Sequence, residues 1–362
     1  MQTLKFNSIL IGNRYSENFT LPDFIRENGK FSRAQTLNKI ITEEYGKIDE
    51  NGVTVSVADV TDAKFDESYG YSFCAKAKHT ALEFTVSKGE KSAKFVADLF
   101  IPVDKTDYNF VVQLDFMKYL PTKYCPVEEL MDGGIAIAHL YYNEISTDNG
   151  DFSSGIAPVL VDRTDLYSAG KLALWAYAAK TVGEYLIKNG YTCKQKLYVA
   201  GHSRLGKTAL LTAAQYEIFA GCMVNCSGCC GAAISRDKQG ENLKIITDVF
   251  PFWFTPNFKK YAEKEFELPF DQHYLMAAVA PRKIFVVAAS DDDWADTSAQ
   301  YLCAEAASAA YSELGAVGLF PRDKMLAIGE KNVGGNVAFF HRKGMHFFSR
   351  EDWAFYINCL NG

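Results

Sequence analysis

A serine stands at a sharp corner between an expected strand and an expected helix, within residues 199–210. The apolar run before Ser203 is typical of a buried strand, and the small residues around the serine allow a tight turn. Such a turn exposes the serine hydroxyl, and the free N–H groups that open the following helix can stabilise an oxyanion. Gly201 lies two residues before Ser203, whereas Gly206 lies three after it instead of two. The segment is therefore a variant nucleophile elbow and predicts a nucleophilic serine.

A carboxylate and a histidine follow Ser203 in the order that a serine triad requires. Residues 283–290 form an apolar run, typical of a buried parallel strand, and the run ends in Asp291, Asp292 and Asp293. Carboxylates at the C-terminal end of such a strand lie where ligands bind. Another short strand is expected over residues 335–340, and it is followed by His341 and His346.

The segments that must position these side chains alternate between strands and helices. Residues 80–86 and 93–101 alternate with period 2 around a turn at 87–90, which predicts an antiparallel hairpin. Residues 110–114 and 134–138 are compact apolar strands, separated by enough chain for crossovers. Apolar residues at helical spacing predict a helix over 168–187 that stops at Asn189 and Gly190. The alternation predicts an α/β fold whose sheet begins antiparallel and continues parallel.

Composition sets the size of the core and the kind of partner. The chain has 362 residues, of which 48% are hydrophobic, so it can bury one large core. We expect a single catalytic domain over 1–362, with residues 1–75 as an N-terminal extension packed on it and a polar helix around 33–46. The net charge of −6 and the dispersed basic residues argue against nucleic-acid and membrane partners.

Targeting signals and cysteines set further expectations. No apolar run of membrane-spanning length occurs, and residues 1–7 lack a signal-peptide pattern. As written, the chain is expected in the cytoplasm; it would be secreted or periplasmic if an export signal had been removed.

The nine cysteines are expected to be reduced, with thiols such as Cys222, Cys303 and Cys359 in apolar segments. Cys226, Cys229 and Cys230 cluster without a second ligand pair at zinc spacing, so no metal is predicted.

Six segments together resemble the glucuronoyl esterases of carbohydrate esterase family 15, especially their bacterial branch. They lie between about residues 130 and 355 and read G-H-S-R-L-G-K (201–207), S-G-C-C-G-A-A-I-S-R (227–236), G-E (240–241), F-W-F-T-P-N-F-K-K-Y (252–261), D-D-W-A-D (292–296) and G-M-H (344–346). The resemblance implies an α/β-hydrolase fold, a three-layer sandwich with helices on both faces of a mostly parallel sheet. It also implies cofactor-free cleavage of the ester between a glucuronic acid on xylan and an alcohol of lignin.

The resemblance also implies roles for individual residues. Ser203 would be the nucleophile and His346 the base, while Arg204 would stabilise the oxyanion through its backbone N–H and its guanidinium group. A cation beside the nucleophile suits the charge that develops there. Three further side chains would bind the sugar. Lys207 would form hydrogen bonds with the sugar hydroxyls, and Glu241 and Trp294 would hold and cover the sugar ring.

The triad acid is less directly implied. The family places it either just after the strand that follows the serine helix or after the next strand. Cys226 occupies the first position here, so Asp292 is the expected acid. Asp291 and Asp293 stay open as alternatives, and an acidic run before a helix is also a normal N-terminal cap.

Each candidate also has an ordinary structural interpretation. Ser203 could be a turn residue, His346 a loop histidine with a structural hydrogen bond, Lys207 a surface lysine, Glu241 a solvated charge and Trp294 a packing aromatic. His341 is expected to be structural and Trp253 to be core, and Arg236 could form a salt bridge near the site.

The leading hypothesis is a serine esterase that acts on a small-molecule or oligosaccharide ester of glucuronic acid, without a cofactor and as a monomer. An esterase for acetylated carbohydrate or another small ester is the first alternative. A catalytically silent carbohydrate-binding protein on the same scaffold is the second.

Overall fold

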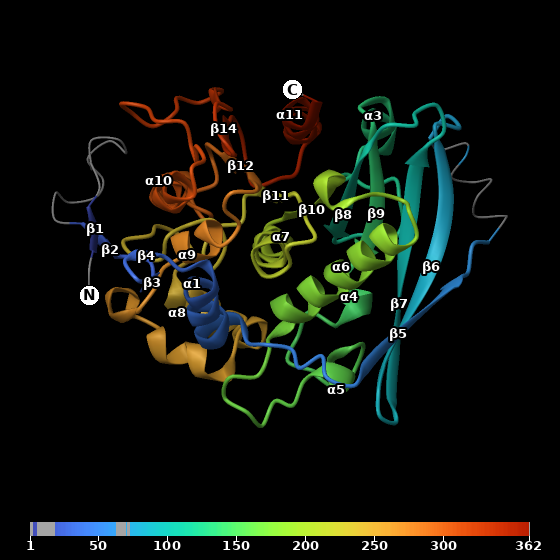
Figure 1. Cartoon of the computed structure of the whole chain (residues 1–362), viewed down its shortest axis with the longest axis horizontal. Coiled ribbons are helices and arrows are strands. Elements are labelled where there is room, and N and C mark those ends of the chain that lie inside the picture. Colours follow the sequence, from blue (N-terminus) through green and yellow to red (C-terminus); the bar gives the residue numbers. More distant parts are fainter. Residues whose placement is uncertain (1–2, 6–18, 63–69, 71–72, 362) are drawn as a thin grey trace.

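The main feature of the computed structural model is one ten-stranded sheet with the order β13-β14-β12-β11-β10-β8-β9-β7-β6-β5 (Figure 1). The structure describes residues 3–5, 19–62, 70 and 73–361. The strands of this sheet are β5 (Val53–Asp59), β6 (Ala77–Lys88), β7 (Lys91–Pro102), β8 (Asn109–Asp115), β9 (Ile135–Tyr141), β10 (Leu197–His202), β11 (Gly221–Asn225), β12 (Lys283–Ala289), β13 (Lys331–Asn332) and β14 (Val337–Arg342). Two short pairs lie apart from it: β1 (Thr3–Lys5) with β2 (Thr20–Pro22), and β3 (Arg26–Glu27) with β4 (Lys30–Phe31).

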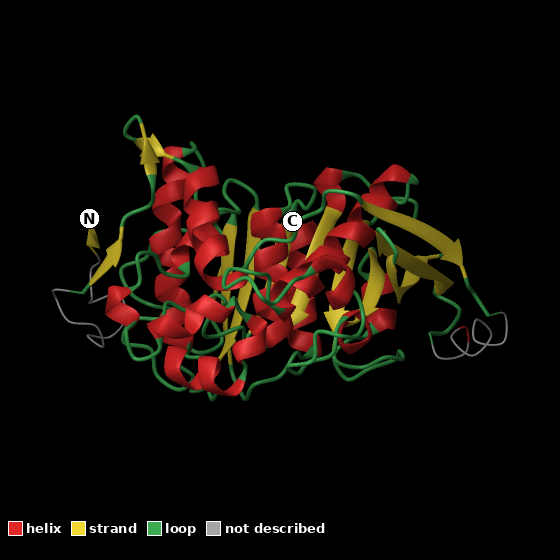
Figure 2. Cartoon of the chain, turned by 90° about the horizontal axis from the view of Figure 1, so that it is seen from below, coloured by secondary structure: helices red, strands yellow, loops and turns green. Residues whose placement is uncertain are grey.

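Helices connect and cover these strands (Figure 2). The α-helices are α1 (Arg33–Ile40), α3 (Val127–Asp132), α4 (Tyr142–Ile145), α5 (Ala157–Leu160), α6 (Lys171–Lys188), α7 (Arg204–Gln215), α8 (Leu243–Val249), α9 (His273–Ala277), α10 (Thr297–Glu313) and α11 (Arg350–Asn361). A π-helical turn covers Ile41–Tyr45, and 3₁₀ turns cover Lys194–Lys196, Pro251–Trp253, Pro256–Tyr261 and Glu265–Glu267.

Two hydrophobic cores lie on opposite faces of the sheet. Side chains alternate between the faces along each strand, so Phe110 and Val112 of β8 join one core while Val111 joins the other. The first core includes side chains of α6, α7 and α10, and the second includes side chains of α3 and α11 (Figure 1). Strands buried on both faces read as continuous apolar runs, which is how they appear in the sequence. The expected three-layer α/β-hydrolase arrangement is confirmed.

The expected strand directions are also confirmed. β6 and β7 form the antiparallel hairpin, and β5 extends it from within the expected N-terminal extension. β9, β8, β10, β11, β12 and β14 are parallel neighbours in that spatial order. β14 runs from Val337 to Arg342, two residues later at each end than expected, so His341 lies within the strand and not after it. The proposed division into one domain plus an extension stays a prediction, and residues 1–2, 6–18, 63–69 and 71–72 of that extension lie outside the described residues.

The segment expected as a polar helix around 33–46 contains a buried acid. α1 runs into the π turn and stops at Gly46, where φ is 79° and a Cβ atom would lie 2.5 Å from Ala169 Cα. Glu44, in the π turn, is fully buried, and its carboxylate accepts both hydrogen bonds that Gln272 Nε2 donates, at 3.0 and 2.8 Å. Burial raises the pKa of Glu44 to about 8. The folded chain therefore holds a proton here that the unfolded chain releases at lower pH.

Replacing Glu44 by glutamine is expected to flatten the pH dependence of stability. Because the folded-state pKa of Glu44 is raised, the free energy of unfolding falls as pH rises from the ordinary glutamate pKa of about 4.5 to about 8, by at most about 1.4 kcal/mol per pH unit. Glu44→Gln removes this titration and should be the more stable protein at pH 8.5. Urea unfolding between pH 5 and 8.5 tests this, with exposed Glu267→Gln as the control. A parallel decline in wild type and Glu44→Gln would contradict it.

Candidate active site

Ser203 occupies the corner between β10 and α7 in a backbone conformation that side chains rarely adopt. Its φ is 57° and its ψ is −125°, and its N–H donates to the Asn225 carbonyl of the neighbouring strand at 2.9 Å. A Cβ atom at Gly201 would lie 2.2 Å from the Leu205 carbonyl oxygen, so the helix can follow the strand this closely only with glycine there. The strained turn at the start of a helix has the local geometry of a nucleophile elbow.

Asp292 and His346 are brought together from loops that follow β12 and β14. His346 Nδ1 lies 2.6 Å from Asp292 Oδ2, and the Ala295 N–H donates to Asp292 Oδ1 at 3.1 Å. Burial acts to raise the pKa of Asp292, but the hydrogen bond and charge of His346, with smaller help from Ala295 and Cys226, lower it below its ordinary value. Asp292 is buried and ionised, whereas the His346 side chain keeps 35% of its surface exposed.

The two neighbouring aspartates do not share this geometry. Asp291 accepts a hydrogen bond from the Ser290 hydroxyl at 2.7 Å, and its backbone N–H donates to the Gly344 carbonyl. Asp293 is exposed. Of the three consecutive carboxylates, Asp292 is therefore the one placed to orient an imidazole.

A second histidine, His202, lies beside His346 with ring centroids 4.5 Å apart. Its Nδ1 lies 2.6 Å from Asn225 Oδ1, and the Asn225 amide in turn donates to Asp352 at 3.0 Å. Burial, followed by the charge of His346, lowers the pKa of His202 to about 3. His202 thus stays neutral and adds no positive charge next to the candidate base. The other histidine named from the sequence is His341. Its Nδ1 lies 2.9 Å from the Leu326 carbonyl oxygen, which is a structural contact away from the Asp292–His346 pair.

The guanidinium group of Arg204 is held in an aromatic and acidic surrounding. It forms an ion pair with Asp148, and its Cζ lies 4.9 Å from the ring centroid of Trp253, which donates to Asp148 at 2.7 Å. Trp253 is buried in the core, as expected. Within the described residues, Arg204 Nε is buried without a hydrogen-bond partner. Asp148 carries no sequence motif and could not have been named from the sequence.

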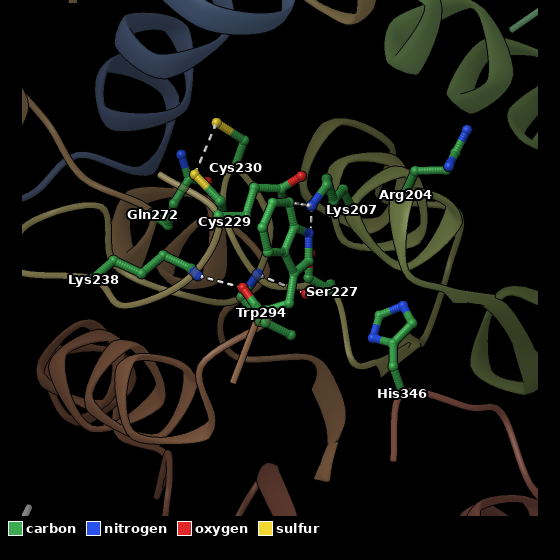
Figure 3. Close-up of polar contacts among 12 residues, drawn as sticks. Arg204, Lys207, Ser227, Cys229, Cys230, Lys238, Gln272, Trp294 and His346 are labelled. Atoms are coloured by element: carbon green, nitrogen blue, oxygen red, sulfur yellow. Dashed lines mark hydrogen bonds and ion pairs between the residues drawn. The ribbon is translucent and has the colours of Figure 1, made fainter. Parts of the chain in front are cut away.

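Lys207 and Glu241 form a buried ion pair, so neither is the solvated surface charge that the ordinary interpretation proposed. Lys207 Nζ lies 3.1 Å from Glu241 Oε2 and donates to the Ser227 carbonyl at 2.6 Å. Both side chains are almost completely buried. Figure 3 shows the Lys207 amine turned toward the segment that contains Ser227. One turn of α7 separates this pair from Ser203, because Lys207 lies four residues after the serine.

Trp294 extends from a loop whose backbone is held firmly. The indole is 51% exposed, which rules out a packing role in the core. Its carbonyl accepts hydrogen bonds from the Glu241 N–H at 3.1 Å and from Lys238 Nζ at 2.8 Å (Figure 3). A Cβ atom at Gly240, where φ is 68°, would lie 2.6 Å from Trp294 Cα. A fixed backbone thus presents the exposed ring next to the Lys207–Glu241 pair. Lys238 helps to hold this backbone, a role that the sequence did not reveal.

Arg236 is the remaining charged residue named from the sequence. It is buried, pairs with Asp271 at 2.7 Å and donates to the carbonyls of Phe270 and Leu268. These contacts account for its charge and donors within the protein, so its role is structural.

Removing the cation of the buried pair is expected to be strongly destabilising. Lys207→Met leaves the Glu241 carboxylate buried without its partner, and such losses cost about 3–5 kcal/mol in the free energy of unfolding. Urea unfolding measures the effect. The double variant Lys207→Met/Glu241→Gln should recover part of the loss, whereas Lys244→Met, whose partner Asp248 is exposed, should leave stability nearly unchanged. Equal losses for Lys207→Met and Lys244→Met would contradict the argument.

Comparison with known proteins decides the family. Residues 84–315, well over half of the chain, match the family model described as "Glucuronyl esterase, fungi". This chain belongs to the glucuronoyl esterase family. Among solved structures, a glucuronoyl esterase from Solibacter usitatus superimposes with a TM-score of 0.83, at 26% identity, covering 95% of this chain and 97% of that one.

Curated relatives of this glucuronoyl esterase family member are also named as esterases. One is a carbohydrate esterase, MZ0003, from an unknown prokaryotic organism, which is 35% identical over 235 residues, 64% of this chain and 54% of that protein. Another, from Podospora anserina, is named 4-O-methyl-glucuronoyl methylesterase and is 27% identical over 278 residues, 73% of this chain and 54% of that protein. The chain thus spans about half the length of these curated relatives. None of the helices among the described residues is long and apolar enough to cross a membrane.

Proposed function

We propose that this chain is a serine carboxyl-ester hydrolase that cleaves esters of glucuronic acid through an acyl-enzyme. The observation that carries the proposal is the Asp292–His346 pair at the ends of β12 and β14, on the same sheet edge as the strained elbow of Ser203. Relatives named 4-O-methyl-glucuronoyl methylesterase support the acyl group. We further propose that the chain acts as a monomer and without a cofactor.

In the proposed reaction His346 takes the hydroxyl proton of Ser203 as the serine oxygen attacks the ester carbonyl carbon. The oxyanion that forms is stabilised by the first N–H of α7, which is that of Arg204, and by the Arg204 guanidinium group. His346 then gives its proton to the departing alcohol, and the glucuronoyl group stays on Ser203. Water attacks this second ester with His346 again as the base, which releases glucuronate and restores the serine.

The sugar is proposed to lie between Trp294 and the Lys207–Glu241 pair. An exposed indole face suits the apolar side of a pyranose ring, while the ammonium and carboxylate groups can exchange hydrogen bonds with its hydroxyls. Because this pair is already satisfied within the protein, the site is preorganised before the substrate arrives.

A substrate panel tests the proposal. Purified protein is assayed with benzyl glucuronate, benzyl galacturonate, acetylated xylo-oligosaccharide and p-nitrophenyl acetate. We expect the highest kcat/KM with benzyl glucuronate. Preference for the acetylated sugar would move the assignment to an acetyl esterase. Sugar binding by calorimetry without turnover of any ester would indicate a silent carbohydrate-binding protein.

A further inference from the structure

The end of β11 places a thiol beside the Asp292–His346 pair. Cys226 directly follows β11, Asp292 follows β12, and His346 lies in the loop after β14. These three strands are adjacent and parallel, so their C-terminal ends meet at one edge of the sheet. One ligand atom of each residue, a sulfur, a carboxylate oxygen and an imidazole nitrogen, lies within 4.8 Å of the other two.

The contacts of these groups show how they are held. Asp292 Oδ2 lies 2.6 Å from His346 Nδ1 and Oδ1 accepts the Ala295 N–H at 3.1 Å, while the Cys226 sulfur lies within 4.8 Å of the carboxylate. Burial raises the pKa of Cys226, so the thiol carries its proton. Two further charged residues, Arg342 and Asp352, act on this thiol. They form an ion pair with each other at 2.7 Å, so their effects on the thiol largely cancel. The thiol, the carboxylate and the imidazole therefore lie close enough to face one common centre.

We propose that Cys226, Asp292 and His346 form an inhibitory site for a thiophilic divalent cation such as Zn²⁺. Cysteine sulfur, imidazole nitrogen and carboxylate oxygen are the ligands that zinc takes in proteins, with bonds of about 2.0–2.3 Å. Ligand atoms around such an ion lie roughly 3.5 Å apart. The Asp292 and His346 ligand atoms, now 2.6 Å apart, must separate slightly while the more distant ligand atoms, which lie within 4.8 Å, close in, and His346 lies in a partly exposed loop that can supply this movement.

The charges and protons balance. Zinc binds the thiolate, the carboxylate and a neutral imidazole, so the two anionic ligands neutralise the dication, which removes the cost of burying an uncompensated charge. The thiol releases one proton to solvent. The proton on His346 Nδ1 is replaced by the metal, and the neutral ring then carries its proton on Nε2.

Inhibition follows from this change of tautomer, and this step rests on the proposed function of His346 as the base. A ring protonated at Nε2 and bound to zinc through Nδ1 has no lone pair with which to take the Ser203 proton. Zinc therefore prevents His346 from acting as the base but does not block sugar binding at Trp294.

Calorimetry tests binding independently of catalysis. Zn²⁺ is titrated into chelator-treated wild type, Cys226→Ser and Cys226→Ala under a metal-free reductant. We expect one site in the wild type with a Kd at least ten times lower than in either variant. Two buffers of different ionisation enthalpy should report about one proton released per zinc. The variant Cys74→Ser/Cys193→Ser, which lacks the two exposed thiols, should bind as the wild type does.

Ester hydrolysis then tests the inhibition. We expect Zn²⁺ to inhibit the wild type with a midpoint near its Kd, Cys226→Ser to need at least ten times more, and Mg²⁺ to have no effect. Equal zinc affinity in wild type and both Cys226 variants, or wild-type binding that leaves turnover unchanged, would overturn the proposal. A protein that hydrolyses no ester fails the proposed function alone, because the calorimetric comparison still reports on the site.

Discussion

Replacing Ser203 by alanine is expected to lower kcat for benzyl glucuronate by about 10⁴-fold or more, because the acyl-enzyme can no longer form. The groups proposed to stabilise the oxyanion, the first N–H of α7 and the Arg204 guanidinium group, do not substitute for a nucleophile. Steady-state kinetics, together with mass spectrometry for the trapped glucuronoyl enzyme, measure the loss. Substrate binding by calorimetry should be retained, since neither Lys207 nor Trp294 contacts the removed hydroxyl in the structure.

Two further variants separate lost chemistry from lost folding. Ser203→Gly should be equally inactive yet more stable by about 1 kcal/mol, because glycine adopts the positive φ of this corner without strain. Ser312→Ala, on the exposed surface of α10, should behave as the wild type. Activity of Ser203→Ala above a few per cent of the wild type would rule out Ser203 as the nucleophile.

Replacing Asp292 by asparagine is expected to lower kcat by about 10³- to 10⁴-fold while KM changes little. Asp292 Oδ1 accepts the Ala295 N–H at 3.1 Å, and an asparagine would keep its oxygen at that position. Its amide nitrogen would then face His346 Nδ1, where Oδ2 now lies at 2.6 Å. An amide that donates to Nδ1 forces the proton of His346 onto Nε2, and the ring can no longer act as a base toward Ser203.

The neighbouring aspartates supply matched controls for this variant. Asp291→Asn and Asp293→Asn should keep kcat within about threefold of the wild type, because Asp291 accepts from Ser290 and Asp293 is exposed. Full pH–rate profiles distinguish a lost base from a local distortion, since only the former removes the rise of kcat with pH. A loss in Asp291→Asn equal to that in Asp292→Asn would show that the triad acid has been misassigned.

Short-range features were predictable because they depend on neighbouring residues. The turn at Ser203 needs Gly201, and a glycine two residues before a serine at the end of an apolar run is visible without any tertiary contact. The β6–β7 hairpin and α6 follow from period-2 and helical patterns in the same way. The family resemblance also allowed Asp292, His346 and Trp294 to be predicted as site residues, because they lie in short recognisable segments.

Other features depend on segments that are distant along the chain. Asp148 reaches Arg204 and Trp253 from a loop that has no motif, and Cys226 meets the Asp292–His346 pair only because β11, β12 and β14 are adjacent. Lys207 and Glu241 each resemble an ordinary charged surface residue, and only packing shows that both are buried.

The sequence by itself determined the α/β class, the strained corner at Ser203, and a carboxylate followed by a histidine further along the chain, since strands, helices and turns follow from local backbone preferences and hydrophobic periodicity. The tertiary structure decided which of three adjacent carboxylates faces the imidazole, that a thiol accompanies it, and that Arg204 and Lys207 have buried acidic partners. The physical reason is that strand order and burial are set by long-range packing, which brings together side chains whose chemistry is ordinary until they share one edge of the sheet.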